Sequence, residues 1–356
     1  MGKYTKPAEQ TESSPGSPVS GKSSGVLGKY TIEDVARELG INKSTVSRAI
    51  SGKGRVGEET RAKVLAFIEE HDYHPNAVAK SLAQNRTCNL GLVLPGDYSS
   101  IQPAFFHEFM EGCCEIAAEH DYDVMVSMIK DQDLSQLERM VRNQKVDGIL
   151  VSWSTLESRV TDMLKKKNVP HVVAGRSPHW DVPCVDNDNE GASREMTHML
   201  LSRGPKNLVL LGGNDRDYVT HCRQRGYETA HAQAGIPIRP EQIFLNINDA
   251  KKAASALETA LRMKADGIIC MDDYICILAL TYLREKGIAI PDDVQIASFY
   301  DSLILKQYTP SVTSLHFDAK ELGRIACKIL LERLDGQETS YSSRIGYQLI
   351  VRESTR

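Results

Sequence analysis

Residues 30–51 read YTIEDVARELGINKSTVSRAIS and contain two short apolar runs at helical spacing, separated by a turn. Thr31 can cap the first helix, and Gly40 can end it in the left-handed conformation. The spacing predicts a second helix over 44–50 and a third over about 58–71. Three short helices with a tight turn between the first two predict a helix-turn-helix unit, which binds DNA through its second helix.

The distribution of charge favours a DNA-facing surface on this unit. The chain has a formal net charge of −4, which is unusual for a DNA-binding protein. Residues 40–57, however, contain no acid and carry four basic side chains: Lys43, Arg48, Lys53 and Arg55. Residues 73–87 contain Lys80 and Arg86, again without an acid. Acid-free basic stretches in an acidic chain predict local contacts with phosphates.

The segment before this unit has a different composition. Residues 1–29 are rich in Ser, Gly, Pro and Lys, so we expect a disordered tail. Within the tail, residues 16–23 match the phosphate-loop pattern G-x-x-x-x-G-K-S. A phosphate loop needs a strand before it and a helix after it, and the flanking residues predict neither. We therefore expect no nucleotide binding there.

From residue 88 onward, short apolar runs alternate with amphipathic stretches. Strands are expected at 90–94, 124–128, 148–151, 172–174, 208–211, 267–270 and 294–299. Helices are expected at about 105–119, 133–142, 156–167, 189–203, 217–234, 250–263, 274–287 and 318–335. This alternation predicts parallel sheets covered by helices on both faces, in two lobes, with ligands at the carboxyl ends of the strands.

From residue 30 to residue 356, the chain resembles the lactose-repressor (LacI/GalR) family of bacterial transcription regulators. The resemblance rests on YTIEDVA at 30–36, NKSTVSR at 42–48, YHPN at 73–76, R-x-x-G-Y at 223–227, DD at 272–273 and V-x-I-x-SFYD at 294–301. It implies an N-terminal all-α helix-turn-helix domain and a two-lobed α/β effector domain, doubly wound and similar to periplasmic binding proteins. The implied function is that of a ligand-responsive transcriptional regulator, most often a repressor of carbohydrate-utilisation genes.

These patterns together divide the chain into five parts. After the tail at 1–29, the helix-turn-helix domain is expected at 30–74, with a hinge helix and linker at 75–87. The first lobe is expected at 88–187 plus 318–336, and the second lobe at 188–317 plus 337–356. The last predicted strand, at about 344–351, ends close to the last residue given. Because no heptad helix follows it, we expect a homodimer.

The resemblance also assigns contacts with double-stranded operator DNA. It places Lys43, Ser44 and Arg48 at base edges, although Arg48 alone could be an ordinary solvated charge. Residues expected to contact phosphates or to position the domain are Thr31, Thr45, Ser47, Arg55 and Asn76. In the family, the hinge helix forms on DNA and inserts a side chain into the minor groove. Its expected contacts here are Ala79, Lys80 and Leu82, although Leu82 could instead pack within a linker.

An effector site is expected in the cleft between the lobes, for a sugar or sugar phosphate. Arg223 and Asp273 match the family residues on its two sides, with a surface salt bridge as the alternative. The loop at 95–106 should contribute Tyr98 and Phe105, and Trp153 could pack on a sugar ring. Packing within a lobe is the alternative for Tyr98 and Trp153. Three residues depart from the family pattern, namely Pro205, Cys276 and Tyr300, and Tyr300 should alter contacts near the cleft.

Two other functions fit the same fold. A solute-binding protein of the cell exterior should have a signal peptide and no DNA motif, and this sequence shows the opposite. An enzyme should carry a catalytic motif, but G-x-G-x-x-G after a strand, a G-x-S-x-G elbow between a strand and a helix, and H-E-x-x-H are all missing. The eight cysteines lack metal-site spacing, so neither metal nor cofactor is expected. We therefore expect a cytoplasmic regulator that is not an enzyme and does not enter the membrane.

Overall fold

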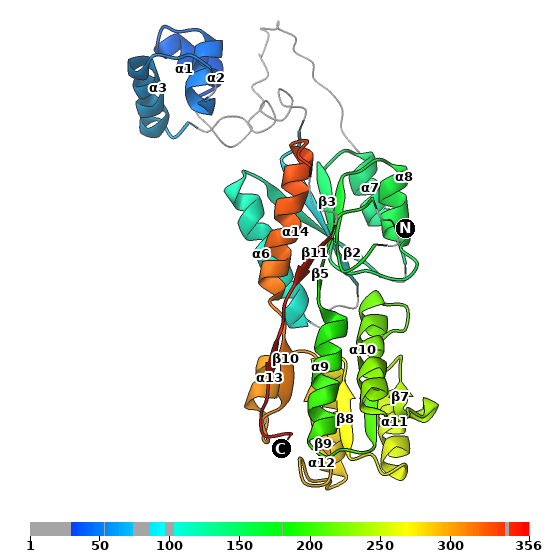
Figure 1. Ribbon diagram of the computed structural model, residues 1–356. Helices are drawn as coiled ribbons and strands as arrows, with labels where there is room; N and C mark the ends of the chain where they lie inside the picture. Colours follow the sequence, from blue (N-terminus) through cyan, green and yellow to red (C-terminus); the bar gives the residue numbers. More distant parts are fainter. Residues whose placement is uncertain are drawn as a thin grey trace, which may run out of the picture. The chain divides into compact units, whose positions relative to one another are not determined.

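The computed structural model describes residues 30–52, 54–73, 86–96, 103–130, 132–177, 179, 181–338 and 342–355 (Figure 1). The chain divides into two units, residues 1–83 and 84–356. The first unit contains three helices: α1 (Ile32–Glu38), α2 (Lys43–Ser51) and α3 (Glu58–Glu70). They enclose a small core of Val35, Ala36, Val46, Ala49, Val64 and Tyr73. The predicted helix-turn-helix is therefore confirmed, with Gly40 in the left-handed conformation at φ 64°.

The first lobe of the second unit is built on a six-stranded sheet of order β11-β5-β4-β3-β1-β2. Its strands are β1 (Asn89–Pro95), β2 (Asp123–Ile129), β3 (Gly148–Val151), β4 (His171–Ala174), β5 (Cys184–Asn187) and β11 (Ser342–Ile345), all paired in parallel. Its helices are α6 (Pro103–Glu119), α7 (Ser135–Arg142), α8 (Arg159–Lys166) and α14 (Ala319–Leu334). Alternate residues of β1 enter two different cores, because successive side chains point to opposite faces of a sheet.

The second lobe has a six-stranded sheet of order β12-β10-β9-β8-β6-β7. Its strands are β6 (Leu208–Leu211), β7 (Ile243–Phe244), β8 (Gly267–Cys270), β9 (Gln295–Ser298), β10 (Thr313–His316) and β12 (Gln348–Ile350). Only the β10–β12 pairing is antiparallel in the described part of this sheet. Its helices are α9 (Asn189–Ser202), α10 (Tyr218–Ala234), α11 (Ala250–Arg262), α12 (Asp273–Glu285) and α13 (Leu303–Gln307), with a 3-10 turn at Pro240–Gln242. Figure 1 shows α9 and α10 side by side on one face of this sheet.

One expected boundary is corrected by the sheet pairing. We predicted that all of 337–356 belongs to the second lobe, but β11 pairs with β5 in the first lobe. The chain then crosses at residues 346–347, and β12 joins the second sheet beside β10. The single strand predicted at 344–351 is thus two short strands in different lobes. The strands β5, β7 and β10 were not predicted, because β5 and β10 contain polar residues instead of a continuous apolar run and β7 has only two residues.

Two glycines bring α6 and α14 into close contact. A Cβ atom on Gly112 would lie 2.0 Å from the carbonyl oxygen of Lys320, and one on Gly323 would lie 2.1 Å from that of Phe109. Any larger residue would push the two helices apart. The first turns of α6, which face the lobe junction, are therefore held firmly on the first lobe.

Candidate DNA-binding and effector sites

Helix α2 presents a polar face to solvent. The predicted base readers Lys43, Ser44 and Arg48 are all exposed. Val46 and Ala49, at 0% and 1% exposure, face the domain core instead. The first turn of α2 contains no acid, so nothing in that turn repels a phosphate. This face can donate hydrogen bonds to DNA without any change in the domain core.

Some residues that we predicted to contact DNA already form hydrogen bonds within the domain. Lys43 forms an ion pair with Glu33, in which both side chains are 60% exposed, and this hydrogen bond lowers the pKa of Glu33. The Thr31 hydroxyl donates to Asp34 Oδ2 at 2.6 Å, within a capping box that starts α1. Ser47 and Arg55 are exposed, and Thr45 is half-buried. Thr31 therefore has a structural role whether or not it touches DNA.

Other predicted residues lie outside the described part of the chain, namely Asn76, Ala79, Lys80, Leu82 and Tyr98. Arg86, from the second acid-free stretch, is described. Its guanidinium donates to Asp335 Oδ1 at 2.8 Å and to the carbonyl of Leu334 at 2.6 Å, at the end of α14. The prediction that Arg86 is unopposed and faces phosphate is corrected, because its acidic partner lies about 250 residues away in the sequence.

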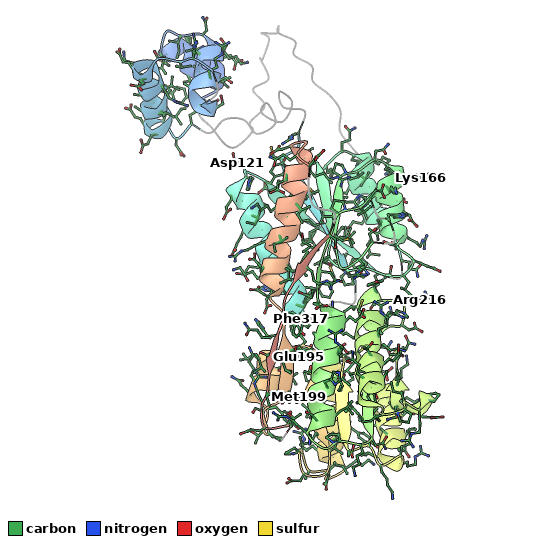
Figure 2. The ribbon with its side chains drawn as sticks, in the orientation of Figure 1. Asp121, Lys166, Glu195, Met199, Arg216 and Phe317 are labelled. Atoms are coloured by element: carbon green, nitrogen blue, oxygen red, sulfur yellow. The ribbon has the colours of Figure 1, made fainter. Side chains whose placement is uncertain are left out.

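Arg223, on the second turn of α10, is buried rather than open to a cleft. Arg223 is 7% exposed, and burial lowers the pKa of its guanidinium to about 10. It donates to the carbonyl oxygen of Met271, and its Nε donates to Asn189 Oδ1 at 3.2 Å. The guanidinium carbon lies 5.7 Å from the ring centre of Phe299 and 5.8 Å from that of Phe317. Phe317, labelled in Figure 2, lies where the chain passes from the second lobe to the first.

Two adjacent carboxyl groups lie near this guanidinium. Asp272 caps α12 by accepting from Ile275 N at 2.7 Å, and its burial raises its pKa to about 7. Burial also raises the pKa of Asp273, which is 6% exposed, while a hydrogen bond from Ser302 lowers it. Arg223 attracts both carboxylates. The structure thus brings Arg223 and Asp273 into one buried polar cluster, which is not the predicted arrangement on two sides of an open cleft.

Two of the predicted aromatic residues, Phe105 and Trp153, are described, and they make different contacts. Phe105, on α6, meets Tyr300 of the second lobe edge-on, with ring centres 6.1 Å apart. Trp153 packs against both cores of the first lobe. Just after it, the backbone bridges the lobes: Leu156 N donates to the carbonyl of Arg216 at 2.9 Å, and Tyr218 N donates to that of Ser154 at 3.1 Å.

A polar cavity of about 250 Å³ lies at this junction, beside the carboxyl end of β5. It is lined by Arg176, Asp186, Asn187, Asp188, Asn189, Glu190, Gly191, Arg194, Cys222 and Arg344. Arg176 donates to the Tyr218 hydroxyl at 3.2 Å, and Arg344 lies 3.5 Å from Asp188. Burial raises the pKa of Asp186 to about 6. Donors and acceptors of both charges therefore surround a space suited to a small, polar molecule.

A chain of hydrogen bonds links Arg223 to this cavity. Asn189 accepts from Arg223 and donates through Nδ2 to Asp186 at 3.1 Å. Arg223 does not line the cavity, but it orients a side chain that does. Our sequence prediction missed the cavity lining, because Arg176, Asp186 and Arg344 come from three strands or strand ends far apart in the sequence. The weak available signal was the polar run DNDN at 186–189 after a short apolar segment.

Two further properties concern the described residues alone. They contain no group of three or more His, Cys, Asp or Glu side chains placed to hold a metal ion. None of their helices combines the length and the apolar character needed to span a bilayer.

Comparison with known proteins agrees with this architecture. The family model "Bacterial regulatory proteins, lacI family" matches residues 31–76, and the "Periplasmic binding protein-like domain" model matches residues 197–355. The solved structure of a transcriptional regulator CelR–cellobiose complex is 26% identical, with a TM-score of 0.70 over 92% of this chain and all of that one. The lac repressor dimer bound to operator and the anti-inducer ONPF is 21% identical with a TM-score of 0.77, and shares the fold.

Curated relatives match over almost their whole length. The HTH-type transcriptional regulator RegA of Clostridium saccharobutylicum is 30% identical over 333 residues, covering 91% of this chain and 99% of RegA. Catabolite control protein A of Priestia megaterium is also 30% identical, covering 92% of this chain and 99% of that protein. Together with the helix-turn-helix unit and the two-lobed domain, these matches show that the chain belongs to the LacI family of helix-turn-helix transcriptional regulators.

Proposed function

We propose that this regulator represses carbohydrate-utilisation genes by binding a pseudo-palindromic operator as a homodimer. Lys43, Ser44 and Arg48 read bases in the major groove, and Thr45, Ser47 and Arg55 contact phosphates. The exposed polar face of α2 carries this proposal. In the hinge segment, Asn76 positions the DNA, and Ala79, Lys80 and Leu82 contact the minor groove.

Selection of binding sites from random double-stranded DNA tests the operator. We expect two half-sites related by a twofold axis. Arg48→Ala should then lower affinity for the selected site at least tenfold and relax the preference at one position of each half-site. Arg37→Ala, on the exposed side of α1, is the matched control and should change affinity little. Equal losses for both variants would contradict base reading by Arg48.

Replacing Leu82 tests the hinge separately. Leu82→Ala should weaken operator binding and reduce DNA bending, measured by gel mobility of circularly permuted sites. Operator binding and bending at wild-type strength would remove Leu82 from the interface.

The proposed effector is a sugar or sugar phosphate bound in the polar cavity at the lobe junction. Two observations support it: the cavity presents donors and acceptors, and similar proteins include the CelR–cellobiose complex and MalR regulators. Arg176 and Asp186 contact the ligand, Arg223 positions Asn189, and Asp273, Phe105 and Trp153 shape the surroundings. Binding shifts the lobes and thereby changes pairing of the hinge segments in the dimer.

A thermal-shift screen with cellobiose, maltose and glucose 6-phosphate tests this effector class. A ligand that binds the folded state should raise the Tm and alter operator affinity. Arg176→Ala should abolish the shift, whereas Arg262→Ala, an exposed arginine on α11, should preserve it. A ligand that shifts both variants equally would have to bind elsewhere.

The homodimer has apolar surface available on the second lobe. Leu303 and Ile304 on α13 are 65% and 59% exposed, which is unusual for adjacent large apolar residues. We assign this surface to a second copy of the chain. Leu303→Glu should lower the measured mass in sedimentation equilibrium toward that of a monomer, with the Tm of the monomer unchanged. An unaltered dimer would place the interface elsewhere.

A further inference from the structure

Tyr300 of the second lobe makes a direct contact with the first lobe. The residue follows β9, is 4% exposed, and its hydroxyl donates to Glu108 Oε2 at 3.3 Å. Glu108 lies on the second turn of α6, one turn after Phe105, whose ring meets Tyr300 edge-on. One phenol side chain therefore provides both an apolar and a polar contact between the lobes.

The carboxyl group of Glu108 depends on this contact. Burial raises the pKa of Glu108, and Asp318 raises it further, whereas His316, Lys306 and the hydrogen bond from Tyr300 lower it. Among the described residues, Tyr300 is the only hydrogen-bond donor to Glu108. A partly buried carboxylate is less stable without a donor, so separating the lobes here costs free energy.

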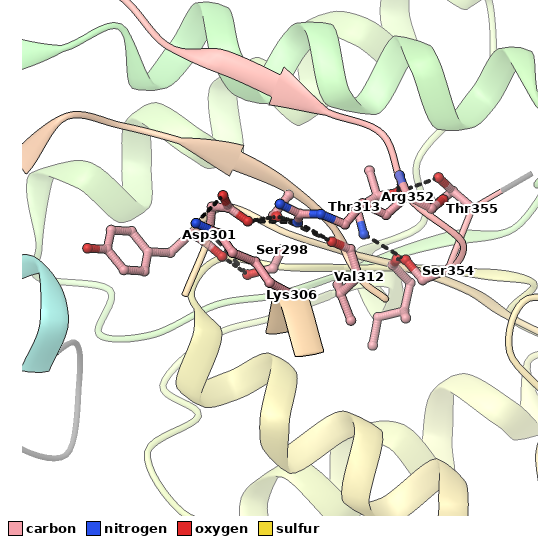
Figure 3. Close-up of polar contacts among 11 residues, drawn as sticks. Ser298, Asp301, Lys306, Val312, Thr313, Arg352, Ser354 and Thr355 are labelled. Atoms are coloured by element: carbon pink, nitrogen blue, oxygen red, sulfur yellow. Dashed lines mark hydrogen bonds and ion pairs between the residues drawn. The ribbon is translucent and has the colours of Figure 1, made fainter. Parts of the chain in front are cut away.

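The backbone that carries Tyr300 is anchored within the second lobe. The next residue, Asp301, binds Arg352 at 2.7 Å, Lys306 at 3.2 Å and the Ser314 hydroxyl at 2.6 Å (Figure 3). Tyr300 N itself donates to the Ser298 hydroxyl at 3.2 Å. Since α6 packs on the first lobe through Gly112, the backbones that carry the two side chains are held in different lobes. The Tyr300–Glu108 contact thus depends on the relative position of the two lobes.

We propose that Tyr300 and Glu108 form a lobe latch: the phenol holds the lobes together without ligand, and an effector in the polar cavity opens the latch by favouring separated lobes. This deepens the proposed function and rests on it, since it names the contact that the effector must break. At 3.3 Å the phenol–carboxylate distance is long for an O–H···O hydrogen bond. A modest preference of the effector for separated lobes is therefore enough to break it.

Amide hydrogen exchange of the full chain without ligand tests the latch. The informative amides are Leu156 and Tyr218, because their hydrogen bonds cross the lobe junction away from Tyr300. Tyr300→Phe removes the hydroxyl and keeps the ring, so it should speed exchange at both amides about threefold to fivefold. Glu108→Gln should do the same, and the double variant should exceed neither by more than about 1.5-fold, as for one shared interaction.

Tyr347→Phe is the matched control. Its hydroxyl also donates to a carboxylate, Glu195 Oε2 at 2.6 Å, but Tyr347 packs on the second-lobe core and Glu195 lies on α9 of the same lobe. It should leave exchange at Leu156 and Tyr218 unchanged. Equal effects of Tyr300→Phe and Tyr347→Phe, or additive effects in the double variant, would overturn the latch.

Cellobiose titration by calorimetry tests the opening step. Tyr300→Phe should bind cellobiose several-fold more tightly than the wild type, because separating the lobes costs less free energy, and Glu108→Gln should do the same. Affinity that is unchanged or lower in Tyr300→Phe would overturn opening of the latch by the effector. If neither the wild type nor a variant binds cellobiose, cellobiose is excluded as the proposed effector. The amide-exchange result then decides alone whether the latch exists.

Discussion

The two functional regions of this chain present their arginines in opposite ways. On α2, Arg48 is exposed, and Arg223 at the lobe junction is 7% exposed with partners on several sides. The first arrangement leaves the side chain available to a large external partner. In the second arrangement, Arg223 donates its hydrogen bonds within the protein, and one of them orients Asn189 at the edge of the cavity. A matched family motif therefore has a different physical setting in each region: an exposed side chain in one, and a buried side chain that positions a neighbour in the other.

The largest expected effect contrasts these two arginines directly. Arg223→Ala removes a buried cation that binds Asn189 and Met271 and attracts Asp272, so the free energy of unfolding should fall by about 4 kcal/mol. Arg48→Ala should change it by less than about 0.5 kcal/mol while reducing operator binding. Urea denaturation of the two variants measures the difference. Similar stabilities would mean that Arg223 is free to bind a ligand, against the buried arrangement.

The next effect concerns the polar cluster behind Tyr300. Arg352→Ala leaves the Asp301 carboxylate, whose side chain is 1% exposed, with Lys306 as its remaining cation, and should cost about 3 kcal/mol. Arg352 and Ser314 hold the pKa of Asp301 below its usual value despite burial. The corresponding stability is present above the unfolded pKa near 4 and is lost as pH falls through the lower folded pKa. Denaturation between pH 2 and 6 should show this acid loss in the wild type and little of it in Asp301→Asn.

A smaller effect should appear at neutral pH in Asp272. Burial raises its pKa to about 7, so between pH 4 and 7 the folded state holds a proton that the unfolded state has released. The free energy of unfolding should therefore decrease as pH rises through this window, by about 2 kcal/mol from this group between pH 5 and 7. Asp272→Asn keeps a good helix cap for α12 and should flatten the decrease. A steeper slope in the variant would contradict a protonated Asp272.

Much of the architecture could be predicted because its signals are local. The helices of the first unit and most strands of the two lobes follow from apolar periodicity and capping residues such as Thr31 and Gly40. The division of the last twenty residues between the lobes could not be predicted. β11 and β12 together contain seven paired residues, and their partners β5 and β10 are equally short. Which sheet takes such a strand depends on contacts with distant segments.

The same distinction separates the two sites. The polar and apolar residues of α2 alternate with helical spacing within one short stretch of sequence. The exposure of Lys43, Ser44 and Arg48 therefore follows from the burial of Val46 and Ala49. The cavity lining combines side chains from β5, β11 and the residues after β4, and no local pattern connects Arg176 with Arg344. Family position led us to predict a ligand contact for Arg223, which in the structure reaches the cavity only through its hydrogen bond to Asn189. It did not indicate whether the guanidinium faces the cavity or supports the residues that do.

The smallest expected effect concerns the exposed ion pair of the helix-turn-helix unit. Lys43 pairs with Glu33 in the DNA-binding unit, and both groups are well exposed. Glu33→Gln removes a negative charge beside the DNA-facing helix and frees the ammonium group, so operator affinity should rise about twofold to fivefold at low salt. The gain should shrink as salt is raised, because exposed charges are screened. Fluorescence anisotropy at 50 and 200 mM salt measures both values, with Glu59→Gln on α3, whose partner is Lys63, as the matched control. A gain of the same size in Glu59→Gln would show that net charge alone sets the affinity. It would contradict a specific contact between Lys43 and the base edges.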